Sequence, residues 1–272
     1  MNMLSPAAEQ KIDEFFNLPF DDLKGVRCPY FNNARINRRG QLRGLIGRGS
    51  PKEIVEEAKI LSIQYHKDIF DHTGHCHLGG ENETATVTEC IRRFLIDNNL
   101  GIDCAGFVSH VLINHFKETN NFNLARHFNF ENKNFFRRLI NHLRPIENMS
   151  VLTYSQDSNT ILIANGTQNT DWQKIMPADL IIMMETGPKL NRNHILLITD
   201  NDGQTIRYVH SRAWSSEGQY GHGITRGEII INNPTKNLLE QQWLEKNQTG
   251  IANETFLEAK NAKTLEIRRI KL

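Results

Sequence analysis

The chain has 272 residues, of which 39% are hydrophobic and 23% are charged, and its formal net charge at pH 7 is +1. This length can bury a sizeable core, and the composition lies outside the range of disordered chains. The low net charge argues against nucleic acid as the main partner, because phosphate binding needs a clustered basic surface. The basic segment at residues 35–48 is better explained as a solvated loop than as an anion site.

Neither a targeting segment nor a membrane span is visible in the sequence. Charged residues follow Met1–Pro6, and no run approaches the roughly 18–20 apolar residues of a spanning helix. Four cysteines, Cys28, Cys76, Cys90 and Cys104, lack the spacing of a disulfide framework. We therefore expect reduced thiols, no membrane partner and a cytoplasmic location, with export by another route left open. The oligomeric state is not indicated.

The first predicted elements are two helices. The segment Ala7–Phe16 favours a short helix inside an N-terminal extension, residues 1–49. A second helix is predicted from Ser50 to about residue 65. Ser50 can cap it, Pro51 suits the first helical position, and Glu53 can close a capping box. Residues 50–272 are then expected to form one main domain.

Residues 72–77 hold three histidines and a cysteine: His72, His75, Cys76 and His77. These side chains can ligate zinc. No second ligand cluster with zinc-finger spacing follows, and adjacent residues seldom all reach one ion. We favour a loop near the functional cleft in which His75 or His77 contacts a substrate, and a zinc-binding interaction module is the alternative. No metal or organic cofactor is expected.

The most informative segment is Gly101–Val108, with the sequence Gly-Ile-Asp-Cys-Ala-Gly-Phe-Val. It follows a predicted helix at Val87–Asn98. Asp103 is a favourable N-cap and leaves Cys104 near the first position of a new helix. The positive end of a helix dipole lowers the pKa of a thiol, and the thiolate is the nucleophile. The segment thus predicts an activated cysteine, although a lone cysteine is more often a small buried hydrophobic residue.

The stretch 116–172 is rich in asparagine and phenylalanine. Within it, Phe135–Leu143 has helical spacing and predicts a packed helix. We interpret the stretch as an insertion that either borders the functional cleft or forms a structural lobe.

Two β-prone runs flank Asn201-Asp202-Gly203, and Asp-Gly between such runs predicts a hairpin. With the turn centred on Asp202, His194 lies directly opposite His210 and points to the same face. A cysteine nucleophile needs a base, and that base needs an orienting group, which the two imidazoles could provide. A register slip of one residue would put them on opposite faces.

Three further elements are predicted after His210. Gly227–Ile231 favours a strand, Leu238–Glu245 favours a short helix, and Thr264–Leu272 alternates apolar and charged residues as a final strand does.

The motifs resemble those of NlpC-type cysteine peptidases, in the same order along the chain. Asp103–Val108 resembles their Asp-Cys-Ser-Gly-Phe/Leu-Val motif, and Pro177–Leu180 resembles Pro-Gly-Asp-Leu. Asn193–Ile198 is similar to their His-Val-Gly-Ile strand. Val209–Ser211 lies where the family has a third polar residue, often a second histidine.

This resemblance implies an α+β, papain-like fold, with an antiparallel sheet and the cysteine at the N-terminus of a packed helix. It implies a domain at residues 50–272 that hydrolyses peptide or amide bonds, typically in bacterial cell-wall peptides. Cys104 would be the nucleophile, His194 the base, and His210 the group that orients His194. A peptide or peptidoglycan fragment would be the substrate, and related acyltransferases leave the reaction class open.

The sequence also departs from the family pattern. Ala105 replaces the usual serine and Ala178 the usual glycine, and the tyrosine that helps to hold the oxyanion is absent from its usual segment. Asp103, Tyr65 and His77 are the candidates for substrate or oxyanion contacts. These departures favour the alternative, which is a non-catalytic protein that binds a peptide or cell-wall ligand on the same scaffold.

Overall fold

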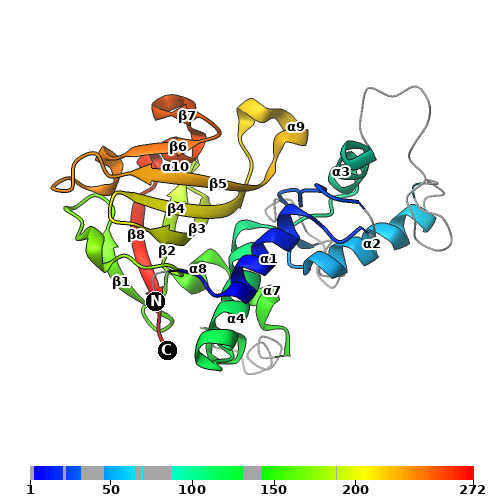
Figure 1. Cartoon of the computed structure of the whole chain (residues 1–272), viewed down its shortest axis with the longest axis horizontal. Coiled ribbons are helices and arrows are strands. Elements are labelled where there is room, and N and C mark those ends of the chain that lie inside the picture. The colour runs from blue at the N-terminus through cyan, green and yellow to red at the C-terminus, as the bar shows by residue number, and fades with distance from the viewer. Residues whose placement is uncertain are drawn as a thin grey trace. The chain divides into compact units, whose positions relative to one another are not determined.

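The structure is a computed structural model that describes residues 3–20, 23–31, 46–64, 69, 87–130, 143–187 and 189–272 (Figure 1). The chain divides into two compact units. Unit 1 comprises Met1–Glu9, Phe107–His210 and Thr225–Leu272, and unit 2 comprises Gln10–Gly106 and Ser211–Ile224. These units are defined by packing, so the functional division at residue 49 remains a prediction.

Unit 1 is built on an eight-stranded sheet with the order β1-β8-β2-β3-β4-β5-β6-β7. The pairings of β1 with β8, of β2 with β3 and β8, of β3 with β4, and of β6 with β5 and β7 are antiparallel. The strands are β1 Thr160–Asn165, β2 Leu180–Thr186, β3 Arg192–Asn201, β4 Thr205–Arg212, β5 Gly223–Ile230, β6 Gln242–Glu245, β7 Gln248–Thr249 and β8 Thr264–Ile270. The predicted α+β class and antiparallel sheet are confirmed.

The helices that lie wholly or mostly in unit 1 are α4 Cys104–Asn120, α5 Leu124–His127, α7 Pro145–Asn148, α8 Val151–Tyr154 and α10 Glu254–Asn261, with the 3-10 turns η3 Trp172–Lys174, η5 Leu238–Glu240 and η6 Gly250–Ala252. In α4 the predicted apolar stripe is buried, since Val108, Val111 and Leu112 are each 0% exposed. The helix therefore forms by burying one face, as its spacing predicts.

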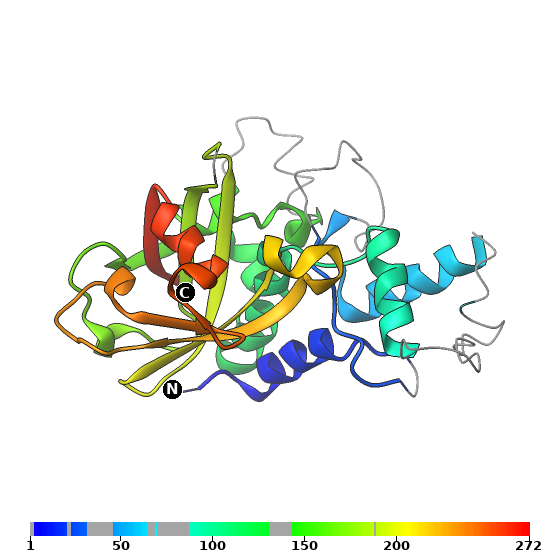
Figure 2. The ribbon, with the colours of Figure 1, turned by 90° about the horizontal axis from the view of Figure 1, so that it is seen from above.

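One face of the sheet carries a large apolar cluster. It includes Met183 of β2, Leu196 of β3 and Tyr208 of β4, and it extends to Trp243 of β6 and Ala259 of α10. Figure 2 shows α10 lying beside the strands. Side chains alternate between the two faces of a strand. The even-numbered residues of β3 up to Ile198 and of β4 from Ile206 therefore lie on the same face of the sheet as this cluster.

The residues from Pro177 lead into β2, which begins at Leu180. Asp179 accepts the Met176 N–H at 2.8 Å and forms a bidentate ion pair with Arg269 of β8. Ala178, which stands where the resembled family has glycine, adopts a φ of +72°. A residue with a Cβ is disfavoured in this region, so the backbone here is strained.

The hairpin of β3 and β4 is present, but its register differs from the predicted one. Leu197 pairs with Val209 and Ile198 with Tyr208, and a bulge follows before Asp200. Continuing this register places His210 opposite Leu196. The predicted pairing of His194 with His210 is thus wrong by two residues, because the loop is centred on Gly203 rather than on Asp202. A shift of two residues keeps both histidines on one face.

The helices of unit 2 are α2 Pro51–Gln64, α3 Val87–Asp97 and α9 Gly218–Gly221, with the 3-10 turn η4 Ser215–Glu217. The helix α1, Pro6–Phe16, begins in unit 1 and ends in unit 2. The Ser50 capping box forms: the Ser50 N–H donates to Glu53 Oε2 at 2.8 Å, and the Glu53 N–H donates to Ser50 Oγ at 3.3 Å. All three helices predicted before Cys104 are confirmed.

The segment Leu238–Glu245 is not the predicted short helix. Its first part is the 3-10 turn η5, and its second part is the strand β6, which pairs with β5. The helical spacing of Leu238, Leu239 and Trp243 suggested a helix, but pairing with a neighbouring strand determines the conformation.

Some predictions concern residues outside the described ranges. They are Tyr65, the His72–His77 segment and the greater part of the helix predicted at Phe135–Leu143. Among the residues that are described, no helix combines the length and the apolar composition that crossing a membrane requires.

Candidate functional site

The cysteine of the predicted site begins α4, and its position in unit 2 is fixed by a buried cap. Asp103 Oδ1 accepts the Gly106 N–H at 2.6 Å, which confirms Asp103 as the N-cap. Its second oxygen, Oδ2, forms a 3.0 Å ion pair with Arg48, and the two side chains are only 8% and 5% exposed. Both carboxylate oxygens of Asp103 are thus engaged in holding the start of the helix.

Glycine at position 106 allows a close approach of the chain. A Cβ on Gly106 would lie 2.6 Å from the Gly47 carbonyl oxygen and 3.2 Å from Arg48 Cδ. The Asp103 N–H donates to that same Gly47 oxygen at 3.1 Å. The glycine of the Asp-Cys-Ala-Gly motif is therefore required because the 47–48 backbone packs against the first turn of α4.

Cys104 and Cys28 are both buried, and as a residue Cys104 is slightly more exposed. Cys104 is 6% exposed, whereas Cys28 is 0% exposed. Burial raises the pKa of the Cys28 thiol strongly, because the thiolate loses its hydration. Cys28 is consequently a structural residue, and it provides an internal reference for the reactivity of Cys104.

The two histidines lie together in unit 1. His194 Nε2 is 2.7 Å from His210 Nδ1, and the rings are edge-to-face with centroids 5.0 Å apart. His194 pairs with Met183 across β2 and β3, so both rings lie on the side of the apolar cluster. His194 is 5% exposed and His210 is 0% exposed. The predicted partnership of the two imidazoles is therefore present despite the shifted register.

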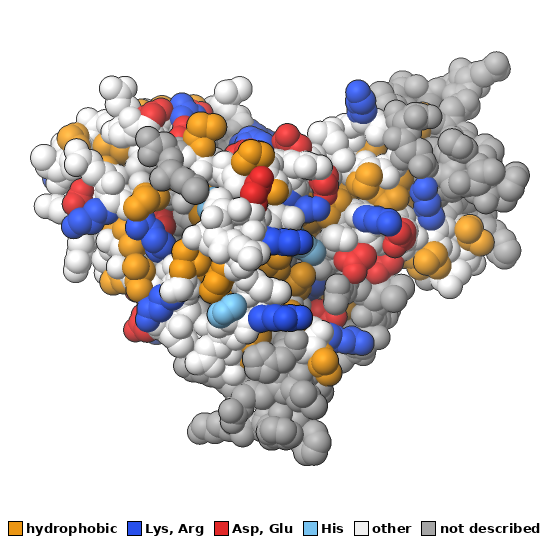
Figure 3. All heavy atoms as spheres, turned by 60° about the horizontal axis from the view of Figure 1, so that its bottom comes forward, with side chains coloured by type: hydrophobic (Ala, Val, Ile, Leu, Met, Phe, Trp, Pro, Cys, Tyr) orange, Lys and Arg blue, Asp and Glu red, His pale blue; other side chains and the backbone are white. Residues whose placement is uncertain are grey.

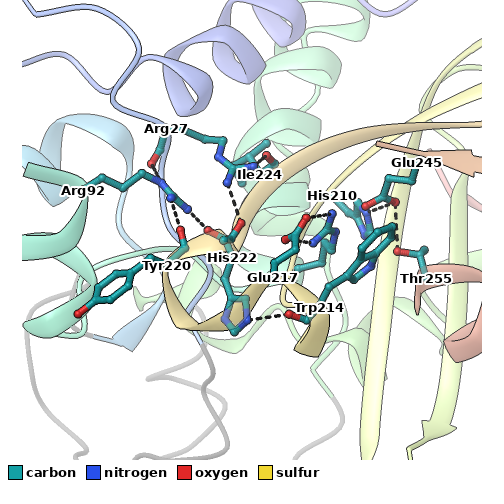
Figure 4. Close-up of polar contacts among 12 residues, drawn as sticks. Arg27, Arg92, His210, Trp214, Glu217, Tyr220, His222, Ile224, Glu245 and Thr255 are labelled. Carbon is teal, nitrogen blue, oxygen red and sulfur yellow. Dashed lines mark hydrogen bonds and ion pairs between the residues drawn. The ribbon is translucent and has the colours of Figure 1, made fainter. Parts of the chain in front are cut away.

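A glutamate that the sequence analysis did not identify continues this arrangement. Glu245 Oε2 lies 3.1 Å from His210 Nε2 and accepts from Tyr208 Oη at 3.0 Å and from Thr255 Oγ1 at 3.1 Å. Figure 4 shows His210, Glu245 and Thr255 pointing toward one another. The result is a continuous chain of side chains from His194 through His210 to Glu245.

Local backbone geometry positions the glutamate and its tyrosine. Glu245 is the last residue of β6, and Lys246 and Asn247 follow with φ values of +48° and +60°. This turn closes the β6–β7 hairpin, in which Glu245 pairs with Gln248. Tyr208 lies over Gly227, where a Cβ would come within 2.4 Å of the tyrosine oxygen. Signals for this site did exist in the sequence, since Asn247 suits a turn and Trp243 and Glu245 are spaced as strand neighbours.

In unit 2, the loop after β4 is held by two arginines (Figure 4). Arg27 donates to the carbonyl oxygens of Ile224 and Gly221 at 3.1 and 2.7 Å. Arg92 donates to those of Tyr220 and His222. Burial lowers the pKa of Arg92 to about 10, with repulsion from Arg27 as a further cause. These guanidinium groups fix the backbone of the loop.

The predicted site residues are thus distributed over both units. Cys104 and Asp103 belong to unit 2, and His194 and His210 belong to unit 1. Tyr65 and His77, the other two candidates for substrate or oxyanion contacts, lie outside the described residues. The structure shows the contact between His194 and His210. The approach of the Cys104 thiol to His194 remains a prediction.

The described residues show no candidate metal centre, and the face in Figure 3 shows no large patch of one charge sign. No group of three His, Cys, Asp or Glu side chains among those described is placed to hold a metal ion. On the face shown in Figure 3, basic, acidic and hydrophobic side chains are intermixed. Comparison with protein-family models, curated proteins and solved structures found no match for this chain.

Proposed function

We propose that this protein is an NlpC-type, papain-like cysteine hydrolase that cleaves peptide or amide bonds. Cys104 is the nucleophile, His194 the general base, and His210 the residue that orients His194. The observation that carries the proposal is the 2.7 Å bond between His194 Nε2 and His210 Nδ1. This bond occupies Nε2 of His194 and leaves Nδ1 to act as the base. The second imidazole thereby fixes the orientation of the His194 ring.

The residues would act in a conventional acyl-transfer sequence. His194 Nδ1 takes the proton of the Cys104 thiol, and the thiolate attacks the carbonyl carbon of the substrate. The protonated His194 then gives this proton to the leaving amine, which produces a thioester. His194 next deprotonates a water molecule, and the resulting hydroxide attacks the thioester. The carboxylic acid leaves, and the protonated His194 returns its proton to the Cys104 thiolate.

The N-terminus of α4 suits the negative charges that form during this reaction. Amide groups in the first turn of a helix point along the axis toward an anion, and the dipole favours negative charge there. Cys104 occupies the first position of α4, so a thiolate would be stabilised at this place. In the proposal its own N–H is one donor to the oxyanion of the tetrahedral intermediate.

A hydrogen bond within unit 2 holds the segment that precedes the nucleophile. Ser211 Oγ donates to the Ile102 carbonyl oxygen at 2.8 Å. Ser211 directly follows His210 in the chain, and Ile102 precedes Cys104 by two residues. The strand end after the second histidine is therefore attached to the segment before the nucleophile.

The substrate class rests on the sequence resemblance. It is a peptide or peptidoglycan fragment, with the acyl side of the cleaved bond transferred to Cys104. Ala105, in place of the family serine, removes a hydroxyl beside the nucleophile.

Selective alkylation tests the proposal without a known substrate. Iodoacetamide at pH 7 is expected to label Cys104 and to leave Cys28 unmodified, because only a thiolate reacts readily. His194→Gln is expected to slow labelling of Cys104 at least tenfold. Dibromoacetone, which can join a thiol to an imidazole, is expected to crosslink Cys104 with His194 in a peptide map. Equal labelling of Cys104 in wild-type and His194→Gln protein would refute the proposed base.

Turnover separates hydrolysis from the second candidate function, a non-catalytic peptide-binding protein. The small exposure of Cys104, 6%, favours that candidate. On a library of peptidoglycan-derived peptides, the wild type is expected to release new amino termini and Cys104→Ala is expected to release none. Binding of a peptide by both proteins, without cleavage by either, would establish the binding function instead.

A further inference from the structure

The carboxylate at the end of the histidine pair accepts several hydrogen bonds. The oxygen Glu245 Oε2 accepts from the hydroxyls of Tyr208 and Thr255 and lies 3.1 Å from His210 Nε2. Glu245 is 1% exposed. An ionised carboxylate can only accept hydrogen bonds, and buried charge is tolerated where several donors surround it. This arrangement therefore suits an ionised Glu245.

We propose that Glu245 is a positioning residue that fixes the proton positions on both imidazoles. Because the carboxylate only accepts, the proton of a neutral His210 lies on Nε2. His210 Nδ1 is then an acceptor, so the short bond from His194 is donated by His194 Nε2–H. His194 Nδ1 is left as the unprotonated nitrogen. This inference rests on the proposed function for the step in which Nδ1 takes the thiol proton.

The Glu245 carboxylate also stabilises a positive charge on the imidazoles, in addition to fixing their tautomers. When His194 becomes an imidazolium, its Nε2–H still donates to His210, and the anion beyond His210 stabilises the positive charge. Other titratable side chains border Tyr208 and Glu245 in a cavity of about 340 Å³. Those that line it are Arg207, Arg226, Glu228 and Lys246.

A glutamine in place of Glu245 reverses the pattern while preserving shape. Its amide NH₂ can donate to His210 Nε2, which moves the proton of His210 to Nδ1. His210 Nδ1–H then donates to His194 Nε2, and the proton of His194 moves to Nδ1. In that state His194 cannot accept a proton from a thiol. Glu245→Gln is thus expected to impair the base without removing a side chain.

Nitrogen-15 NMR of histidine-labelled full-length protein reads these tautomers directly. For the neutral rings of the wild type, we expect both His194 and His210 to carry hydrogen on Nε2, with His→Gln variants supplying the assignments. In Glu245→Gln we expect one or both rings to become Nδ1–H, or a mixture of tautomers. The matched control is Glu258→Gln in α10, since Glu258 accepts from Thr186 at 2.7 Å and no bond joins it to the histidines. That variant is expected to leave both tautomers unchanged.

The second readout is the rate of Cys104 alkylation by iodoacetamide as a function of pH. We expect Glu245→Gln to lower this rate near pH 7 at least tenfold, with Glu258→Gln equal to wild type. A loss of structure alone would change unfolding without shifting the pH profile of the folded protein.

Two results would overturn the inference. One is a wild-type spectrum in which His210 carries hydrogen on Nδ1, and this measurement decides the matter even if Glu245→Gln fails to fold. The other is a folded Glu245→Gln protein whose tautomers and alkylation profile match the wild type. If the tautomers follow Glu245 but Cys104 reactivity is independent of His194, the positioning role stands and the hydrolase proposal fails.

Discussion

Replacing Asp103 by asparagine separates the two tasks of the side chain that holds the start of α4. Asparagine is as good an N-cap as aspartate, so its Oδ1 can still accept the Gly106 N–H. The substitution removes only the negative charge that pairs with Arg48 at 3.0 Å. Arg48, with a side chain only 5% exposed, then loses a buried partner of opposite charge.

The expected loss follows from this geometry. Removing one partner of a buried ion pair costs about 3–5 kcal/mol, because the remaining charge keeps its desolvation penalty. Asp103→Ala also removes the cap and is expected to lose about 1 kcal/mol more. Arg48→Met added to Asp103→Asn eliminates the buried cation, so the double variant is expected to be more stable than Asp103→Asn alone.

Urea denaturation followed by far-ultraviolet circular dichroism measures these differences. For a chain of this size a loss of 3–5 kcal/mol corresponds to a fall in Tm on the order of 10 °C. An unfolding free energy of Asp103→Asn within about 1 kcal/mol of wild type would show that the pair is not buried as described, since exposed pairs contribute no more than that. A double variant less stable than Asp103→Asn would contradict the reasoning about Arg48.

Two further predictions concern unit 1. Burial lowers the pKa of His115, against a smaller opposing effect of Glu118, and its Nδ1 accepts the Ser5 N–H at 3.2 Å. Unfolding frees this imidazole to bind a proton, so the unfolding free energy is expected to fall as pH drops below the ordinary histidine pKa of about 6.5. His115→Gln should flatten this dependence in urea titrations between pH 5 and 8, and an unchanged slope would contradict the assignment. Ala178→Gly is expected to leave stability unchanged or raise it by up to about 1 kcal/mol, because relief of the positive φ outweighs the entropy of glycine. Ala7→Gly in α1, where the backbone is helical, should instead lose up to about 1 kcal/mol, and a similar loss at position 178 would disprove the strain there.

Local signals in the sequence were sufficient to predict much of the fold. The Ser50 capping box and the Asp103 cap involve groups three residues apart, so the helices that they begin can be recognised without tertiary contacts. The hairpin was likewise visible in its turn residues. Its register was not, because the loop is centred about one residue beyond Asp202 and a bulge between Ile198 and Asp200 shifts the pairing by one residue.

Glu245 shows that local signals for a strand do not reveal the role of a buried side chain. Its segment has helical spacing at Leu238, Leu239 and Trp243, and only pairing with β5 makes Gln242–Glu245 a strand. The partners that define its role, His210 and Thr255, are 35 and 10 residues away in the chain. The long-range arrangement of buried polar groups therefore required the structure.

The loop after β4 is held by contacts of an unusual kind. Arg27 and Arg92 donate hydrogen bonds to the backbone carbonyl oxygens of residues 220, 221, 222 and 224. Every amino acid has such a carbonyl oxygen. Substitutions of the side chains of Tyr220 and His222 should therefore change the backbone conformation of the loop little. Selection would fall instead on the two arginines and on Gly223, where a Cβ would come within 2.6 Å of the Cys28 carbonyl oxygen. Diverged homologues could thus present new side chains from a constant backbone.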